Sequence, residues 1–184
     1  SPWSIWSDFY DFMQPKGDEL WITNGRINEI WESGFDDYER RPYTQQRWPM
    51  NFVEIHPDDA AARGIESGDL VAVGSTRVPV QKDFNLGVKS DDMWFSGLMK
   101  RGHIKLVSGQ FSAVAMVTPA IKKGVLFTDF LKMDAPANSV TPRVPDPITM
   151  NYRFKIASGT VMKFGESPYK HKFDQMTFKR RDIV

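Results

Sequence analysis

Short runs of β-branched and aromatic residues, each ended by turn-forming residues, recur along most of this 184-residue chain. Four of them stand at 20–23, 52–55, 70–73 and 124–127, and one small helix is indicated between the second and the third. Many short strands, one small helix and long loops predict a closed or nearly closed β-barrel. Such barrels bind ligands on the loops at one mouth.

The clearest local pattern follows the second run. Phe52–Ile55 reads as a strand, and Pro57 then stands at the first position of a helix, followed by acidic residues at its positive dipole end. Gly64 is the residue expected just after the helix end. A turn leads from there to the strand at 70–73. The segment is therefore predicted to fold as strand, helix, turn and strand.

The barrel is predicted to span 19–160, with an insertion at 82–102 and a C-terminal extension at 161–184. Its last strand is expected at 152–156, where apolar and polar residues alternate. The stretch 33–50 is rich in Arg, Asp and Gln and predicts a long polar loop.

The first 18 residues are unusually aromatic and include Trp3, Trp6 and Phe9. A free tail rarely carries so many large apolar side chains, because they need a surface that covers them. We expect these three residues to pack against another part of a larger parent subunit, of which this chain is a fragment.

Composition excludes several classes of function. Lys plus Arg is 24 and Asp plus Glu is 23, a balance that argues against a nucleic-acid binder. The chain has no Cys, so it can supply no disulfide, thiolate zinc ligand or Cys ligand to an iron–sulfur cluster. The longest nearly apolar run, 111–117, is far too short to span a membrane.

No catalytic or metal-binding constellation stands out. His56, His103 and His171 have no second His or carboxylate at metal-ligand spacing, and His56 is explained as part of a helix start. Phosphate-binding glycine motifs and nucleophile motifs are absent from the sequence. No catalytic residue and no protein ligand to a metal are predicted.

The segment 23–31 is the strongest candidate for binding. After a strand it combines a tight turn at Gly25, the planar cation of Arg26, the amide of Asn28 and the indole of Trp31. Gly permits close approach of a ligand to the backbone, and Arg suits phosphate. On spacing alone, a turn from a strand into a short helix at 27–31, with a surface Arg, remains the preferred interpretation.

Several ordered blocks between 23 and 156 carry a family resemblance. They are Thr23-Asn24-Gly25-Arg26 with Trp31, Ile55-His56-Pro57-Asp58-Asp59-Ala60 through Gly68-Asp69-Leu70-Val71, Gly124-Val125-Leu126-Phe127, Ala137-Asn138-Ser139-Val140-Thr141, Asp146-Pro147-Ile148 and Phe154-Lys155. The chain resembles the C-terminal, molybdopterin-guanine-dinucleotide-binding domain of the dimethyl sulfoxide reductase family. Within it, the chain looks most like the large subunit of arsenite oxidase, and iodate reductase shares that branch.

The resemblance implies a mainly β fold, a six-stranded double-psi β-barrel. It implies molybdenum bis(molybdopterin guanine dinucleotide) as cofactor and an iron–sulfur cluster in another domain of the parent subunit. The cofactor performs oxygen-atom transfer, arsenite to arsenate, and the protein orients it. The implied partners are the remainder of the large subunit and a Rieske-type iron–sulfur small subunit, in the periplasm.

The resemblance also implies site residues. Phe130 is expected to line the substrate approach, and Glu32 stands where many relatives have a different residue beside the Trp. We expect Asn24, Arg26, Asn138 and Lys155 to line one concave face. The residues implied to contact the cofactor are Asn24, Gly25, Arg26, Ile27, Asn28, Glu29, Trp31, Ser33, Asn138 and Lys155.

Two alternatives stay open. The first is a related oxyanion reductase acting on iodate or arsenate. The second is a free-standing barrel module without metal chemistry, because a fold does not fix a function.

Overall fold

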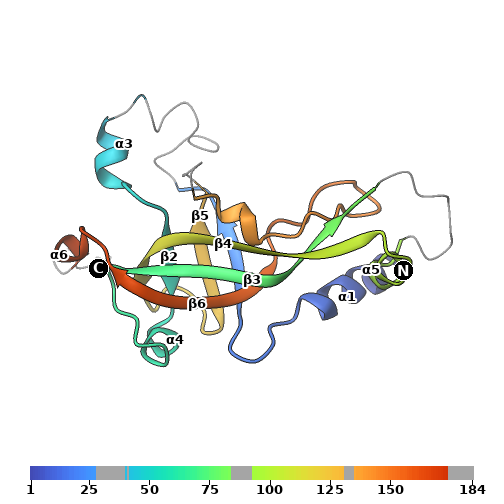
Figure 1. Ribbon diagram of the computed structural model, residues 1–184, viewed down its shortest axis with the longest axis horizontal. Helices are drawn as coiled ribbons and strands as arrows, with labels where there is room; N and C mark the ends of the chain where they lie inside the picture. The colour runs from blue at the N-terminus through green and yellow to red at the C-terminus, as the bar shows by residue number, and fades with distance from the viewer. Residues whose placement is uncertain (28–39, 41, 84–92, 131–134, 174–184) are drawn as a thin grey trace, which may run out of the picture.

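The computed structural model describes residues 1–27, 40, 42–83, 93–130 and 135–173 (Figure 1). Its strands are β1 (Leu20–Gly25), β2 (Phe52–Ile55), β3 (Asp69–Gln81), β4 (Ile104–Val117), β5 (Val125–Asp129) and β6 (Ala157–Glu166). Its helices are α1 (Pro2–Met13), α3 (Pro42–Arg47), α4 (Pro57–Ala61), α5 (Phe95–Lys100), the short 3₁₀ helix η1 (Ala137–Val140) and α6 (Lys170–Phe173).

The strands close into a barrel in the order β1-β5-β2-β4-β3-β6. The pairs β1·β5 and β2·β4 are parallel, and the other four are antiparallel. This closed, mainly β architecture confirms the predicted fold class. Among the described residues, no helix is both long enough and apolar enough to cross a membrane.

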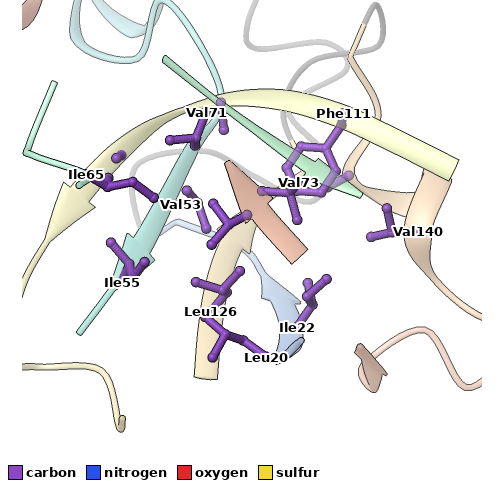
Figure 2. Packing of buried hydrophobic residues seen from close by; sticks show 14 of the residues in the cluster. Leu20, Ile22, Val53, Ile55, Ile65, Val71, Val73, Phe111, Leu126 and Val140 are labelled. Atoms are coloured by element: carbon purple, nitrogen blue, oxygen red, sulfur yellow. The ribbon is translucent and has the colours of Figure 1, made fainter. Parts of the chain in front are cut away.

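Alternation of side chains along the strands fills the barrel (Figure 2). In β1, Leu20 and Ile22 point inward and are buried, as are Val71 and Val73 in β3. Leu126 of β5, which pairs with Ile22, is fully buried in the same cluster. Burying a side chain of this size stabilises the fold by roughly 1.5–3 kcal/mol, so this cluster is the main source of barrel stability.

The helix start predicted after β2 is present. His56 is the N-cap of α4, and its Nδ1 accepts a hydrogen bond from the Asp58 amide at 3.2 Å. Gly64 follows the helix with a φ of 61°, the left-handed conformation that favours glycine.

Helix α1 and α5 pack together beside the far end of the long β3–β4 pair (Figure 1). In α1, Ile5, Phe9 and Met13 recur every four residues and are the buried face. Phe9 meets Phe95 of α5 edge-on, with ring centroids 5.4 Å apart. Phe9, Met13 and Phe95 belong to a second apolar cluster, separate from the barrel interior.

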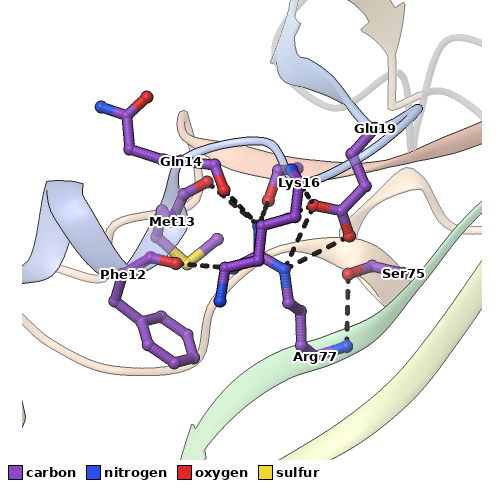
Figure 3. Close-up of polar contacts among 8 residues, drawn as sticks. Phe12, Met13, Gln14, Lys16, Glu19, Ser75 and Arg77 are labelled. Carbon is purple, nitrogen blue, oxygen red and sulfur yellow. Dashed lines mark hydrogen bonds and ion pairs between the residues drawn. The ribbon is translucent and has the colours of Figure 1, made fainter.

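Arg77 of β3 ties α1 to the barrel (Figure 3). Its guanidinium donates to the carbonyls of Phe12 and Gln14, both at 2.6 Å, at the C-terminal end of α1. It also forms an ion pair with Glu19 at 2.7 Å and donates to Ser158 Oγ at 2.6 Å. A cation at this end of a helix satisfies carbonyls that have no partner within the helix.

This packing corrects the expectation for the aromatic N-terminal segment in part. Phe9 is fully buried against this chain's own residues, and Trp6 packs partly buried on the same cluster. The reason is that α5, from the predicted insertion, supplies the covering surface. Trp3 remains 73% exposed, and its contact with another part of a parent subunit stays a prediction.

Three local predictions were wrong. Helix α3 lies within the segment predicted to be a polar loop, with Pro42 at its first position. Residues 152–156 are not the last strand, because Tyr152 makes only an isolated bridge and 154–155 form a turn. The last strand is β6, so the barrel extends beyond residue 160 to Glu166.

Candidate functional site

The candidate site lies where β1 ends. Asn24 follows Leu20 and Ile22 on the inward face of β1, so its amide enters the end of the barrel and is only 6% exposed. A buried amide needs hydrogen-bond partners, and segments distant in sequence provide them here. Asn24 therefore marks the place where these segments meet.

Three partners surround the Asn24 side chain. Its Nδ2 donates to Asn138 Oδ1 at 3.2 Å and to the Phe154 carbonyl at 2.9 Å. Its Oδ1 accepts from Lys155 Nζ at 3.0 Å, and its backbone carbonyl accepts from the same amine at 2.9 Å. The predicted residues Asn24, Asn138 and Lys155 thus form one hydrogen-bonded cluster.

Asn138 is held in place by the packing of η1 on β4. Ser139 Oγ donates to the Gln110 carbonyl at 2.9 Å. At Gly109 a Cβ atom would collide with the Ser139 carbonyl, so only glycine lets η1 approach this closely. The Asn138 side chain is exposed, apart from its contact with Asn24.

Lys155 is the cation of the cluster. Its Nζ lies 5.2 Å from the ring centroid of Phe130, a cation–π distance. Partial burial lowers the pKa of Lys155, and the nearby charge of Arg26 lowers it further. Among the described residues, no carboxylate forms an ion pair with Lys155.

Arg26 and Ile27 follow directly after β1. The Arg26 side chain is exposed and makes no hydrogen bond or ion pair with any described residue, and Ile27 is half-buried. Because Arg26 influences the Lys155 amine, the two positive charges share this end of the barrel.

Gly25 has a packing role. A Cβ atom there would lie 2.7 Å from the ring of Phe127 in β5, so the ring can keep its position only beside a glycine. Close approach of a ligand to Gly25 stays a prediction. Four further residues predicted to contact the cofactor lie outside the described residues, and so does Glu32. The four are Asn28, Glu29, Trp31 and Ser33.

The sequence did not indicate two parts of this cluster. The Phe154 carbonyl is a backbone group, so its role cannot be predicted from the type of residue. Arg153, next to it, is buried under α1 and contacts the Phe9 ring, which the sequence places far away. No group of three or more His, Asp or Glu residues suited to a metal occurs in the described part of the chain.

Part of the chain matches a known family. Residues 20–84 match the family described as Molydopterin dinucleotide binding domain. This match assigns the part of the chain from β1 to β3 to the family. The cofactor predicted from the sequence, a molybdopterin dinucleotide, is the one that the family description names.

Three relatives refine the comparison. Iodate reductase subunit IdrA of Denitromonas iodatirespirans is 52% identical, and that of Pseudomonas sp. (strain SCT) is 47% identical, over all of this chain and 21% of each relative. Arsenite oxidase subunit AioA of Herminiimonas arsenicoxydans is 36% identical over 30% of this chain and 6% of the relative. The chain spans about a fifth of the length of its iodate reductase relatives.

These values correct the predicted branch within the family. The expectation favoured arsenite oxidase, yet the iodate reductase subunits match the whole molybdopterin-binding chain at higher identity.

Proposed function

We propose that this chain is the part of a molybdenum enzyme's catalytic subunit that holds one molybdopterin guanine dinucleotide of a bis(dinucleotide) cofactor, and that the enzyme reduces iodate. The convergence of Asn24, Asn138 and Lys155 at one end of the barrel carries the first half of this proposal. The identity to two iodate reductase subunits over the whole chain supports the second half.

The chemistry of the cluster fits such a ligand. Lys155 and Arg26 present two positive charges without a carboxylate partner among the described residues, which suits the phosphates of a dinucleotide. The Asn138 amide is exposed beside them and has both donors and acceptors for a heterocycle edge. Partial burial of the Lys155 amine strengthens its attraction for an anion.

In this proposal the residues of the chain bind and orient, and the cofactor supplies the oxygen-atom transfer and electron chemistry. Asn24 fixes the Lys155 amine through two acceptors, so that the charge points to one place. Nothing in the cluster is arranged as an acid–base pair. We further propose, from the family resemblance, an iron–sulfur cluster in another domain, a Rieske-type small subunit and a periplasmic location.

The test uses the full-length protein that carries this sequence. We expect molybdenum and guanosine monophosphate to be released from it on denaturation in a fixed ratio, and the purified protein to reduce iodate with a reduced viologen dye. Lys155→Met and Asn138→Ala should lower the bound content of both. Lys122→Met, which changes an exposed lysine at the opposite end of β5, is the control and should leave it unchanged.

The outcomes distinguish the candidate functions. Normal cofactor content in Lys155→Met and Asn138→Ala would remove the cluster from the binding site. Oxidation of arsenite without reduction of iodate would replace the substrate by that of the second candidate, which the partial match to arsenite oxidase favours. A protein without molybdenum and nucleotide would leave the free-standing module as the remaining function.

A further inference from the structure

Residues 153–156 carry two groups of the site but belong to no helix or strand. The Phe154 carbonyl and the Lys155 amine both meet Asn24. Because no ladder of backbone hydrogen bonds fixes this segment, a side chain within it must hold its position. Arg153 is placed to do so.

Arg153 points away from the site and into the packing of α1. Its guanidinium carbon lies 4.4 Å from the ring centroid of Phe9, a cation–π contact. Its Nη2 donates to Asp146 Oδ2 at 3.3 Å, and the side chain is only 7% exposed. The guanidinium is therefore clamped between α1 and the turn that begins at Asp146.

Asp146 is itself immobilised. Its Oδ1 accepts from the amides of Ile148 at 3.0 Å and Thr149 at 2.8 Å, so one carboxylate organises the turn and also receives Arg153. Burial acts to raise the pKa of Asp146, but these hydrogen bonds and Arg153 outweigh it, and the pKa lies below its ordinary value. The anchor thus stays negative at neutral pH.

Keeping a cation here is costly. Burial lowers the pKa of Arg153, opposed by the charges of Asp146 and Asp8, and its Nε has no hydrogen-bond partner among the described residues. Buried ion pairs contribute little net stability compared with apolar packing. Their better-attested role is to specify one arrangement, which is what the segment next to the site requires.

We propose that Arg153 is a positioning residue of the cofactor site, which fixes residues 153–155 so that the Phe154 carbonyl and the Lys155 amine meet Asn24. This inference rests on the proposed function. The proposal gives α1 a role in the binding site, because Phe9 of α1 is one of the two contacts that hold the Arg153 guanidinium. Arg153 acts through Phe154 and Lys155 and touches no ligand itself.

The experiment is a double-mutant cycle on the full-length protein. The measured quantity is the rate at which nucleotide-bearing cofactor is lost under mild urea, with circular dichroism confirming that the fold persists. The variants are Arg153→Met, Lys155→Met and the double variant. Arg143→Met is the matched control, because Arg143 is exposed in the same region and its side chain forms no hydrogen bond or ion pair with any described residue.

Arg153→Met should speed cofactor loss by about tenfold, the size expected for coupled neighbours. In the Lys155→Met background it should add less than about twofold, because the group that it positions is gone. Arg153→Lys keeps the charge and should fall between the wild type and Arg153→Met, and it repeats the cycle if Arg153→Met does not fold. Arg143→Met should behave as the wild type.

Two results overturn the proposal. Cofactor loss from Arg153→Met at the wild-type rate would show that the clamp does not support the site. Equal acceleration in both backgrounds would assign Arg153 to general stability. If Lys155→Met alone releases cofactor at the wild-type rate, the proposed cofactor site is wrong, and the positioning role falls with it.

Discussion

At the scale of single residues, Asn24 is the centre of the site. It uses both amide protons and its oxygen within the protein, on two segments that each lie more than 100 positions from it in the sequence. Such a buried hub costs desolvation unless every group is paired. It therefore fixes how the two segments are placed relative to β1, because both must pair with the same side chain.

We expect Asn24→Ala to lower the free energy of unfolding by about 1–3 kcal/mol, because the Phe154 carbonyl and Asn138 lose their partner. Urea unfolding of the chain, followed by Trp fluorescence, measures this. Thr23→Ala, at a neighbouring half-buried position on the other face of β1, is the comparison and should cost less. Equal losses of unfolding free energy in the two variants would contradict the role of Asn24 in joining these segments.

At the scale of elements, the contact between η1 and β4 determines where Asn138 lies. The backbone of η1 rests directly on the strand at Gly109. The motif containing Asn138 was visible in the sequence, but the need for glycine at 109 depends on a contact formed only by folding. Local pattern could not reveal it.

Gly109→Ala should displace η1 and weaken cofactor retention in the full-length protein, with stability lowered by roughly 1–3 kcal/mol, as for an overpacked core. Gly165→Ala in β6 is the matched control, because a Cβ there would meet only the Leu70 side chain, at an ordinary 3.8 Å. If both variants retain cofactor equally, the η1 contact does not place Asn138.

A second feature at the scale of elements is the group of charged residues around Asp69, the first residue of β3. It joins β3 to β6 and α6. The buried Asp69 carboxylate pairs with Lys163 and Lys170, each at 3.0 Å, and accepts from the Glu66 amide at 2.7 Å. Burial acts to raise the pKa of Asp69, but these partners outweigh it, so the pKa lies below its ordinary value.

The sign of the pH effect follows. A carboxyl with a lowered pKa in the fold contributes stability above its unfolded pKa of about 3.9 and loses it as pH falls through the folded value. We expect Asp69→Asn to lower stability at pH 7 and to flatten the loss of stability below about pH 4. Urea unfolding of wild type and variant across this range checks it, and parallel acid curves would contradict it.

At the scale of the whole molecule, the many short strand-like runs, with one small helix and long loops between them, were enough to predict the closed barrel. The sequence could not place its last strand, because Gly159 looks like a break in β6. In the fold, a Cβ at Gly159 would collide with the Gly74 carbonyl, so this glycine serves the crossing of two strands. The support from α1 was missed for a similar reason, since it depends on contacts between distant segments.

The residues proposed for the site came partly from the local pattern at 23–31 and partly from the family resemblance. Asn138 and Lys155 were predicted only through blocks that carry the resemblance, and folding brings both to Asn24. Asn28, Glu29, Trp31 and Ser33 remain predictions, because they lie outside the described residues.

Binding of the dinucleotide at this end of the barrel is tested most directly by the reactivity of the Lys155 amine toward an acylating reagent. The reactivity is measured in the full-length protein with its cofactor and again after the cofactor is removed. Mass spectrometry quantifies the label at Lys155 and at Lys122, which lies at the opposite end of β5. Because the pKa of Lys155 is lowered, its amine should react readily once uncovered. We predict several-fold protection of Lys155 by bound cofactor and none of Lys122. Equal labelling of Lys155 in both forms would contradict the claim that this end of the barrel holds the dinucleotide.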